Sequence, residues 1–222
     1  LAPLAAAAAP SCPLAGVGLP AIPALQQAVQ RGSVTIVALG SSSTFGAGAS
    51  EAGRAYPPLL EARLRQAWPG VAVRVVNAGA SGETSSEMVA RIGRDVLPQR
   101  PDLVIWQAGG NEALRGREPA EFAAVMQVGL EALAGVPVVL MDNQRSPRLA
   151  ARGGLFDGVL AGLGPPVFRR SAAMAAWGAD GQVLVHPDGL HLNDRGYQCL
   201  ADELAQALAP WQPGAVVART GP

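Results

Sequence analysis

Short apolar runs alternate with amphipathic helical patterns along most of the chain. The runs are rich in β-branched residues, as is typical of strands that are buried on both faces of a sheet. They lie at residues 34–39, 71–76, 103–107 and 136–141, with a shorter fifth run at 166–168. Strands and helices that alternate at this spacing predict parallel strands joined by right-handed crossovers. We therefore expect an α/β domain with three layers and a central parallel sheet of about five strands.

Apolar residues between these runs recur at helical spacing. Leu60, Leu64 and Trp68 stand four residues apart, and Met88 pairs with Ile92 in the same way. Two longer stripes predict further helices: Phe122, Val125, Met126, Leu130 and Leu133 form the first, and Tyr197, Leu200, Leu204 and Leu208 form the second, which Asn193 precedes as the expected N-cap.

A single domain accounts for this pattern, since 222 residues are enough for one α/β domain with a substantial core. We expect an arm rich in Ala, Pro and Gly over residues 1–31, the domain over residues 32–212 and a tail over residues 213–222. Within the domain, the Gly- and Pro-rich stretch 153–166 predicts a loop over the sheet.

The first ten residues consist almost entirely of Ala, Leu and Pro, and they resemble the end of a signal peptide or a leader behind one. We therefore expect export to the periplasm or the exterior. A plain Ala/Pro tail is the alternative, and it leaves the protein in the cytoplasm. No stretch approaches the ~20 apolar residues that a membrane-spanning helix needs.

Charge and composition exclude several classes of chemistry. The chain carries 17 basic and 17 acidic residues, without a basic stripe, so nothing indicates a nucleic-acid partner. All the basic residues are arginine. The absence of lysine excludes Schiff-base and Ser–Lys mechanisms.

Polar residues gather directly after the predicted strands. In an open parallel sheet, ligands bind at the carboxyl ends of the strands. The polar segments lie at residues 40–46, 77–82, 109–112 and 142–145, and a fifth, 186–191, precedes the last predicted helix. Their common placement predicts a functional site at this edge of the sheet.

Ester cleavage by a serine requires a base within hydrogen-bond reach and a third group that orients the base. Histidine suits the base because it titrates near neutral pH. The chain has two histidines, His186 and His191. Asp188 lies three residues before His191, so in a turn its carboxylate can accept from one ring nitrogen while the other nitrogen faces the serine.

A tetrahedral intermediate also needs hydrogen-bond donors for its oxyanion. The N–H groups of Ser42 and Gly79 and the side-chain amide of Asn111 are three candidates. Gly79 has no side chain to block a substrate carbonyl. Three further polar residues at this edge are candidates for substrate binding: Glu112, Gln144 and Arg145.

Four of these segments resemble the SGNH hydrolases, also called the GDSL esterase/lipase family. Residues 40–46 (GSSSTFG) are similar to the family's first block, Gly-Asp-Ser-x-Thr-x-Gly, which places the nucleophile at Ser42. Residues 77–82 (NAGASG) and 109–111 (GGN) resemble the second and third blocks, which supply oxyanion donors. Residues 188–191 (DGLH) resemble the fifth block, which holds the acid and the base.

The resemblance implies a flavodoxin-like α/β/α sandwich with Ser42 as nucleophile, His191 as base and Asp188 as orienting acid, and it implies no cofactor or metal. Two positions depart from the family pattern. Ser41 stands where the first block usually has Asp, and Glu112 stands where the third block usually has Asp. The first departure raises the question of how the nucleophile loop is braced, and the second affects the rim of the site.

Other interpretations of the same residues remain open at this stage. Ser41 and Ser43 are alternative nucleophiles. His186, Asp188 and His191 are possible metal ligands, although their spacing fits no common zinc pattern. The glycines around residue 42 are also compatible with a phosphate loop, but Gly-Lys-Ser/Thr is missing.

The most direct functional hypothesis is hydrolysis of an ester, with a preference for a short acyl group on a carbohydrate or another polar alcohol. Three alternatives keep the same fold: an acyltransferase that passes the acyl group to a sugar, a lysophospholipase or thioesterase, and an inactive binding module. The sequence gives no indication of the oligomeric state.

Cys12 and Cys199 are the only cysteines. We expect them to form a disulfide that attaches the arm to the last helix, because such a bond suits an exported protein. A small buried Cys199 with a free thiol at Cys12 is the alternative.

Overall fold

The computed structural model describes residues 12–179 and 181–209. They fold around one central sheet. Five parallel strands lie in the order β2-β1-β3-β4-β5. Their bounds are β1 Ser33–Gly40, β2 Ala72–Gly79, β3 Leu103–Gln107, β4 Val138–Met141 and β5 Val167–Phe168. All five lie where the apolar runs predict strands, and no end shifts by more than three residues.

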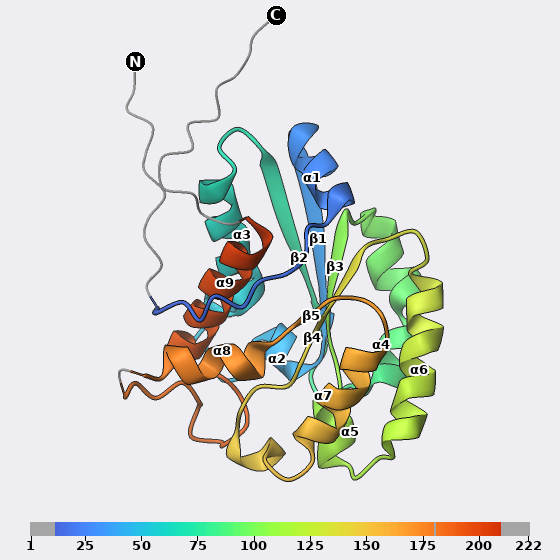
Figure 1. Cartoon of the computed structure of the whole chain (residues 1–222), viewed down its shortest axis with the longest axis vertical. Helices are drawn as coiled ribbons and strands as arrows, with labels where there is room; N and C mark the ends of the chain where they lie inside the picture. The colour runs from blue at the N-terminus through green and yellow to red at the C-terminus, as the bar shows by residue number, and fades with distance from the viewer. Residues whose placement is uncertain (1–11, 180, 210–222) are drawn as a thin grey trace, which may run out of the picture.

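Helices cover both faces of this sheet (Figure 1). On one face lie α3 Tyr56–Ala67, α8 Arg170–Trp177 and α9 Asp194–Leu208, with α1 Pro23–Gln30 beside β1; on the other lie α4 Ser85–Ala90, α5 Gly110–Leu114, α6 Pro119–Ala132 and α7 Gly153–Gly162. Short turns complete the fold: α2 Ser42–Phe45, η1 Ala52–Arg54, the π-helical η2 Ile92–Val96, η3 Leu97–Gln99 and η4 Pro147–Leu149. The expected α/β/α sandwich is confirmed.

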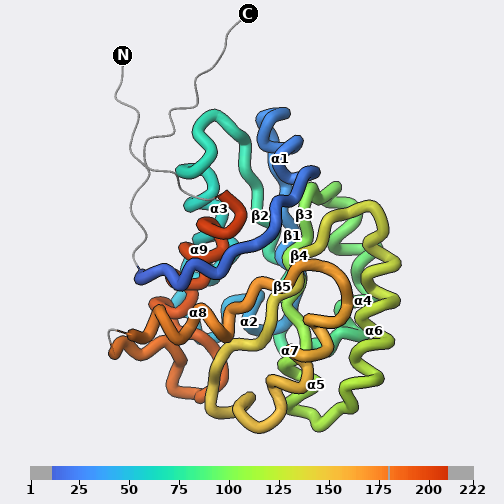
Figure 2. Tube along the Cα trace, in the orientation of Figure 1, coloured from blue at the N-terminus to red at the C-terminus, as the bar shows by residue number. Residues whose placement is uncertain are grey.

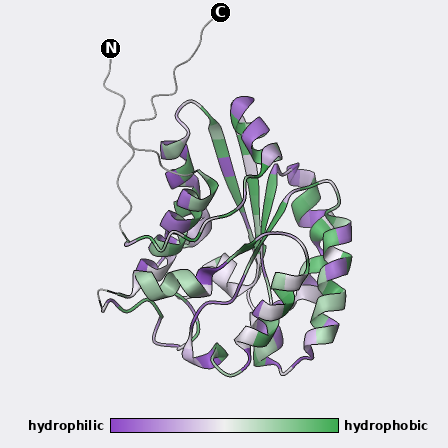
Figure 3. Cartoon of the chain, in the orientation of Figure 1, coloured by the Kyte–Doolittle hydropathy of each residue, from purple (hydrophilic) through white to green (hydrophobic). Residues whose placement is uncertain are grey.

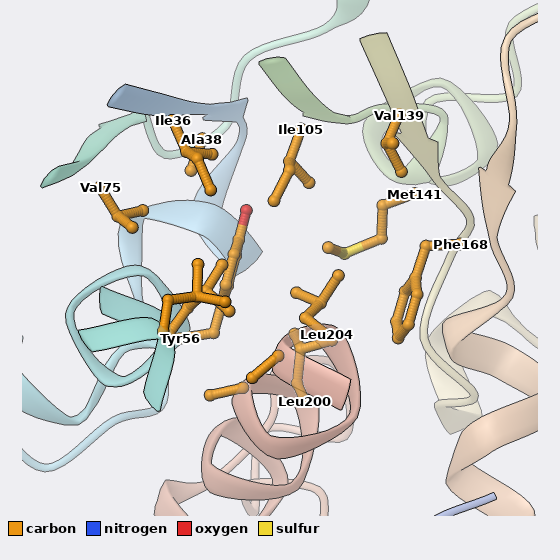
Figure 4. Packing of buried hydrophobic residues seen from close by; sticks show 14 of the residues in the cluster. Ile36, Ala38, Tyr56, Val75, Ile105, Val139, Met141, Phe168, Leu200 and Leu204 are labelled. Atoms are coloured by element: carbon orange, nitrogen blue, oxygen red, sulfur yellow. The ribbon is translucent and has the colours of Figure 1, made fainter. Parts of the chain in front are cut away.

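The burial of each strand follows its place in the sheet. Every residue of the central strand β3 is buried, whereas the edge strand β2 alternates between buried and exposed positions. Figure 3 shows largely apolar strands at the centre and helices that carry both apolar and polar residues. In Figure 4, Ile36, Ile105 and Val139 of the sheet face Leu200 and Leu204 of α9.

The stretch 153–166 is a correction to the sequence analysis, because most of it forms α7 and not a loop. Phe156 and Leu160 lie four residues apart and are fully buried, so their packing outweighs the low helix propensity of the intervening glycine. A Cβ at Gly154 or Gly158 would meet open space, so neither glycine is required by packing. The patterns also missed α1 and α8.

Residues 12–22, which belong to the predicted arm, run along α9 before α1 begins (Figure 2). The N–H groups of Ala15 and Val17 each donate to the carboxylate of Glu203 at 2.8 Å. Trp177 Nε1 donates to the same carboxylate at 3.1 Å. Glu203 is fully buried, and these three donors satisfy a charge that would otherwise be costly to bury.

The predicted disulfide between Cys12 and Cys199 is present, with the two Cα atoms 5.3 Å apart. It attaches the start of the described chain to the middle of α9. Residues 1–11, the predicted leader, and residues 210–222, which include the predicted tail, lie outside the described residues. Within residues 12–179 and 181–209, no helix has both the length and the apolar character to cross a bilayer.

Replacing both cysteines should destabilise the protein. The bond spans a sequence separation of 187 residues, and the chain-entropy model gives about 5 kcal/mol for so long a loop, an upper value when native strain is present. We expect Cys12→Ala/Cys199→Ala to unfold at clearly lower temperature, and dithiothreitol to lower the Tm of the unmodified protein but not of the variant. Two free thiols in the unreduced, unfolded protein would contradict the bond.

Candidate active site

The turn that carries Ser42 begins where β1 ends. Helix α2 consists of Ser42–Phe45, Ser41 is its N-cap, and Gly46 ends it in a left-handed conformation with φ 108°. Ser42 is the first residue of this helical turn, a position whose N–H has no partner within the helix. The turn therefore presents both the hydroxyl and the backbone N–H of Ser42 at the carboxyl edge of the sheet.

Gln107, the last residue of β3, holds this turn through hydrogen bonds to its side-chain amide. Its Oε1 accepts from Ser41 N–H and Ser41 Oγ, each at 3.1 Å, and from Thr44 Oγ1 at 3.4 Å. Ser41 and Gln107 are both buried. Ser41 stands where the first block usually has Asp. The neutral amide of Gln107, from the neighbouring strand, braces the loop at this position.

The second part of the site is a short hairpin formed by residues 184–193, called the base hairpin below. Val185 and Leu192 form an antiparallel bridge, and His186 N–H donates to the carbonyl of His191 at 2.8 Å. Asn193 N–H closes the hairpin on Leu184 at 2.9 Å. Asn193 then accepts from Gly196 N–H as the N-cap of α9, as predicted, so the hairpin leads directly into this helix.

Ser42, His191 and Asp188 form one hydrogen-bonded row. His191 Nε2 lies 2.8 Å from Ser42 Oγ, and His191 Nδ1 lies 2.6 Å from Asp188 Oδ2. Asp188 Oδ1 accepts from the N–H groups of Leu190 and His191 at 2.9 and 3.0 Å. A carboxylate can only accept, so it fixes the proton on Nδ1 and leaves Nε2 to accept from the serine hydroxyl.

The carboxylate of Asp188 keeps its charge in this arrangement. Burial opposes ionisation of the group, but hydrogen bonds from the His191 ring and from the two N–H groups outweigh it and lower the pKa of Asp188. His186 Nδ1 is more distant, at 3.5 Å from the same Oδ2. Ser42 is bonded to His191, and the hydroxyl of Ser43 points to Gln144 instead.

Asn111 lies in α5, the short helix that follows β3. Gly109, with φ 98°, is the N-cap of this helix, so Asn111 is its second residue and not a cap. Its Nδ2 donates to the carbonyl of Glu83 at 2.7 Å, which occupies one of two amide hydrogens. The second hydrogen stays available to a ligand.

The structure does not support the expected role of Gly79. Its N–H already donates to Asn77 Oδ1 at 2.9 Å. A Cβ at this position would stand 2.1 Å from the N atom of Phe45, so glycine is needed here because the nucleophile turn packs directly against β2. The residue supports the turn, and an oxyanion would have to compete with Asn77 for its N–H.

Two of the three candidate substrate-binding residues point into the protein, which corrects the sequence analysis. Glu112 is buried, and its Oε1 accepts from Ser85 N–H at the start of α4. Gln144 is also buried and bonds to Ser43 and to the carbonyl of Leu190. Arg145 alone is exposed.

Sequence reasoning missed Arg91, which holds the ends of two strands together. It is almost fully buried, and its Nη2 donates to the carbonyls of Gly40 and Ala78 at 3.2 and 2.8 Å. Its Nε donates to Glu83 at 2.7 Å, on the loop that Asn111 binds. The only signal of this role in the sequence was the position of Arg91 directly before Ile92, which pairs with Met88 at helical spacing and is buried.

One family model and several known proteins match this chain. The model of the Non-GDSL lipase-like family matches residues 7–210. Esterase TesA of Pseudomonas aeruginosa is 32% identical over 129 residues, which cover 55% of this chain and 61% of that protein, less than two thirds of its length. An acetylxylan esterase of Geobacillus stearothermophilus is 36% identical over 63 residues, which cover 28% of this chain and 29% of that protein.

Among solved structures, AlinE4, an SGNH-hydrolase family esterase, is 33% identical with a TM-score of 0.58, and the match covers 82% of this chain and 97% of that chain. The family model spans nearly all the described residues and includes Ser42, Asn111, Asp188 and His191. The chain therefore belongs to the Non-GDSL lipase-like family and is an SGNH-type hydrolase.

Proposed function

We propose that this protein hydrolyses carboxylic esters through an acyl-enzyme on Ser42. The observation that carries the proposal is the row of hydrogen bonds from Ser42 Oγ through His191 to Asp188, at 2.8 and 2.6 Å. Each member meets the geometric requirement for a nucleophile, a general base and an orienting acid.

Acylation uses the proton arrangement of the row. His191 Nε2 takes the hydroxyl proton while Ser42 Oγ bonds to the ester carbonyl carbon, whose oxygen becomes the oxyanion. The tetrahedral intermediate then breaks its bond to the alcohol, and the imidazolium returns the proton to the departing oxygen. Asp188 stays ionised and stabilises the imidazolium, as its lowered pKa favours.

Deacylation repeats these steps with water. His191 takes one proton from water, the hydroxide oxygen bonds to the acyl carbon, and the proton returns to Ser42 Oγ as the acid leaves. Every step uses groups of this chain and one water molecule.

Two donors for the oxyanion are the N–H of Ser42 and the second amide hydrogen of Asn111. Gly82 is a better third candidate than Gly79. It belongs to the loop that Asn111 binds, its carbonyl is held by Arg115 Nη2 at 2.6 Å, and its φ of 82° with open space at the Cβ position suits close approach of a ligand.

The preferred substrate in this proposal carries a short acyl group on a carbohydrate or another polar alcohol. The similarity to an acetylxylan esterase supports it, although that match is short. Phe45, three residues after Ser42 on the same turn, has a half-exposed ring that can contact the apolar face of a sugar. The disulfide is compatible with the export that the leader suggests.

His191 should be essential and His186 should not. His191→Ala removes the group bonded to Ser42, so kcat should fall by several powers of ten. His186→Ala is the matched control and should keep most of the activity, because the ring of His186 bonds to Asp188 and not to Ser42. Steady-state kinetics against p-nitrophenyl acetate decide this, and the reverse pattern would move the base to His186.

Asn111→Ala should lower kcat about 10²- to 10³-fold with little change in KM, because an oxyanion donor acts mainly in the transition state. Arg115→Met removes a contact to the same loop but no proposed donor, and it should lower kcat far less. A rise in KM alone for Asn111→Ala would instead make Asn111 a substrate-binding residue.

A substrate panel tests the proposed reaction and its specificity. We expect kcat/KM to decrease along p-nitrophenyl esters of increasing acyl length, acetylated sugars to be hydrolysed, and Ser42→Ala to lose activity on all of them. Higher rates on long acyl chains would favour a lysophospholipase or thioesterase. Faster capture of the acyl group by an added sugar than by water would favour an acyltransferase.

A further inference from the structure

Gln144 lies between the two parts of the site that must meet. Its Oε1 accepts from Ser43 Oγ at 2.9 Å, and its Nε2 donates to the carbonyl of Leu190 at 2.8 Å. Ser43 follows the nucleophile directly, and Leu190 directly precedes His191. One side-chain amide thus joins the neighbours of both reacting residues.

The orientation of this amide is fixed by its partners. The carbonyl of Leu190 can only accept a hydrogen bond, so the NH₂ group must face it, and the oxygen must then face the hydroxyl of Ser43. Gln144 is buried, with 4% of its surface exposed, so water does not readily replace these bonds.

The segment that carries Gln144 is itself held on both sides. The carbonyl of Asp142 accepts from Arg170 Nε and Nη2 at 3.1 and 2.7 Å, and Arg170 is fully buried in α8. On the other side, Asn143 N–H donates to Asp157 of α7 at 2.9 Å. Because its backbone is fixed, the Gln144 side chain can act as a rigid spacer.

We propose that Gln144 is a positioning residue that holds Ser42 and His191 at hydrogen-bond distance. The inference rests on the proposed catalytic row. Ser42 and His191 are 149 residues apart in the sequence, and the Gln144 amide bridges their neighbours across the gap between the nucleophile turn and the base hairpin. Gln107, in contrast, holds the nucleophile turn alone.

Gln144→Met keeps the length of the side chain but removes both hydrogen bonds. We expect kcat per active site, counted by burst titration with p-nitrophenyl acetate, to fall about 10- to 100-fold, as small misplacements of reacting groups do. KM should stay unchanged. Labelling of Ser42 by a fluorophosphonate should slow by a similar factor, because it needs the same proton transfer.

Ser43→Ala removes one end of the bridge. It should lower kcat in the same direction, and the double variant with Gln144→Met should be no slower than Gln144→Met alone, since both changes break one connection. Ser171→Ala is the matched control, because it removes a hydrogen bond to the side chain of Asp142, two residues before Gln144, without touching the bridge. It should lower Tm and leave kcat per active site unchanged.

Gln144→Glu gives a signature that a purely structural role does not. The introduced carboxyl can donate to Leu190 only when it is protonated, and its burial favours that form. The ratio of its kcat to that of the unmodified protein should therefore rise as the pH falls.

Unchanged kcat per active site in Gln144→Met, or an equal fall in Ser171→Ala, would overturn the inference. Ser42→Ala separates it from the proposed function. If that variant is inactive, the triad stands and the Gln144 results judge the spacer alone; if it stays active, the triad and the spacer both fail.

Discussion

Activation of a serine by histidine works only while two atoms stay within about 3 Å of each other. In this protein those atoms belong to residues 149 positions apart, one on the turn after β1 and the other on a hairpin before α9. The surrounding structure keeps these two segments at a fixed distance from each other. The sheet supplies a fixed edge, and buried amides and backbone bonds connect the two segments across it.

These connections are mostly neutral. Gln107 and Gln144 satisfy the hydroxyls beside Ser42, and Tyr197 Oη donates to the carbonyl of Ala47 at 2.7 Å, which joins α9 to the loop after the nucleophile turn. Neutral bonds place no further charge close to the imidazolium that the proposed mechanism forms on His191. Asp188 is the ionised group that contacts His191, so it dominates the electrostatics of the base.

The sequence sufficed for the strands and for the contact between Asp188 and His191 because both depend on local signals. The runs at 34–39 and 103–107 are apolar throughout, and the spacing of Asp188 and His191 sets their contact within one turn. Gln107, Gln144 and Arg91 could not be assigned in this way. Each is polar and buried, and its role depends on which distant backbone and side-chain groups the fold brings to it. The packing of the nucleophile turn on Gly79 is of the same kind, since only the structure shows Phe45 against it.

The attachment of residues 12–17 to α9 determines when this part of the protein can be completed during synthesis. Its partners, Trp177, Cys199 and Glu203, all belong to the last quarter of the chain. On a ribosome or during passage through a membrane pore, the chain emerges from its amino end, so the first described residues must wait for the final helix. The Cys12–Cys199 bond can therefore form only after nearly all of the described chain has emerged.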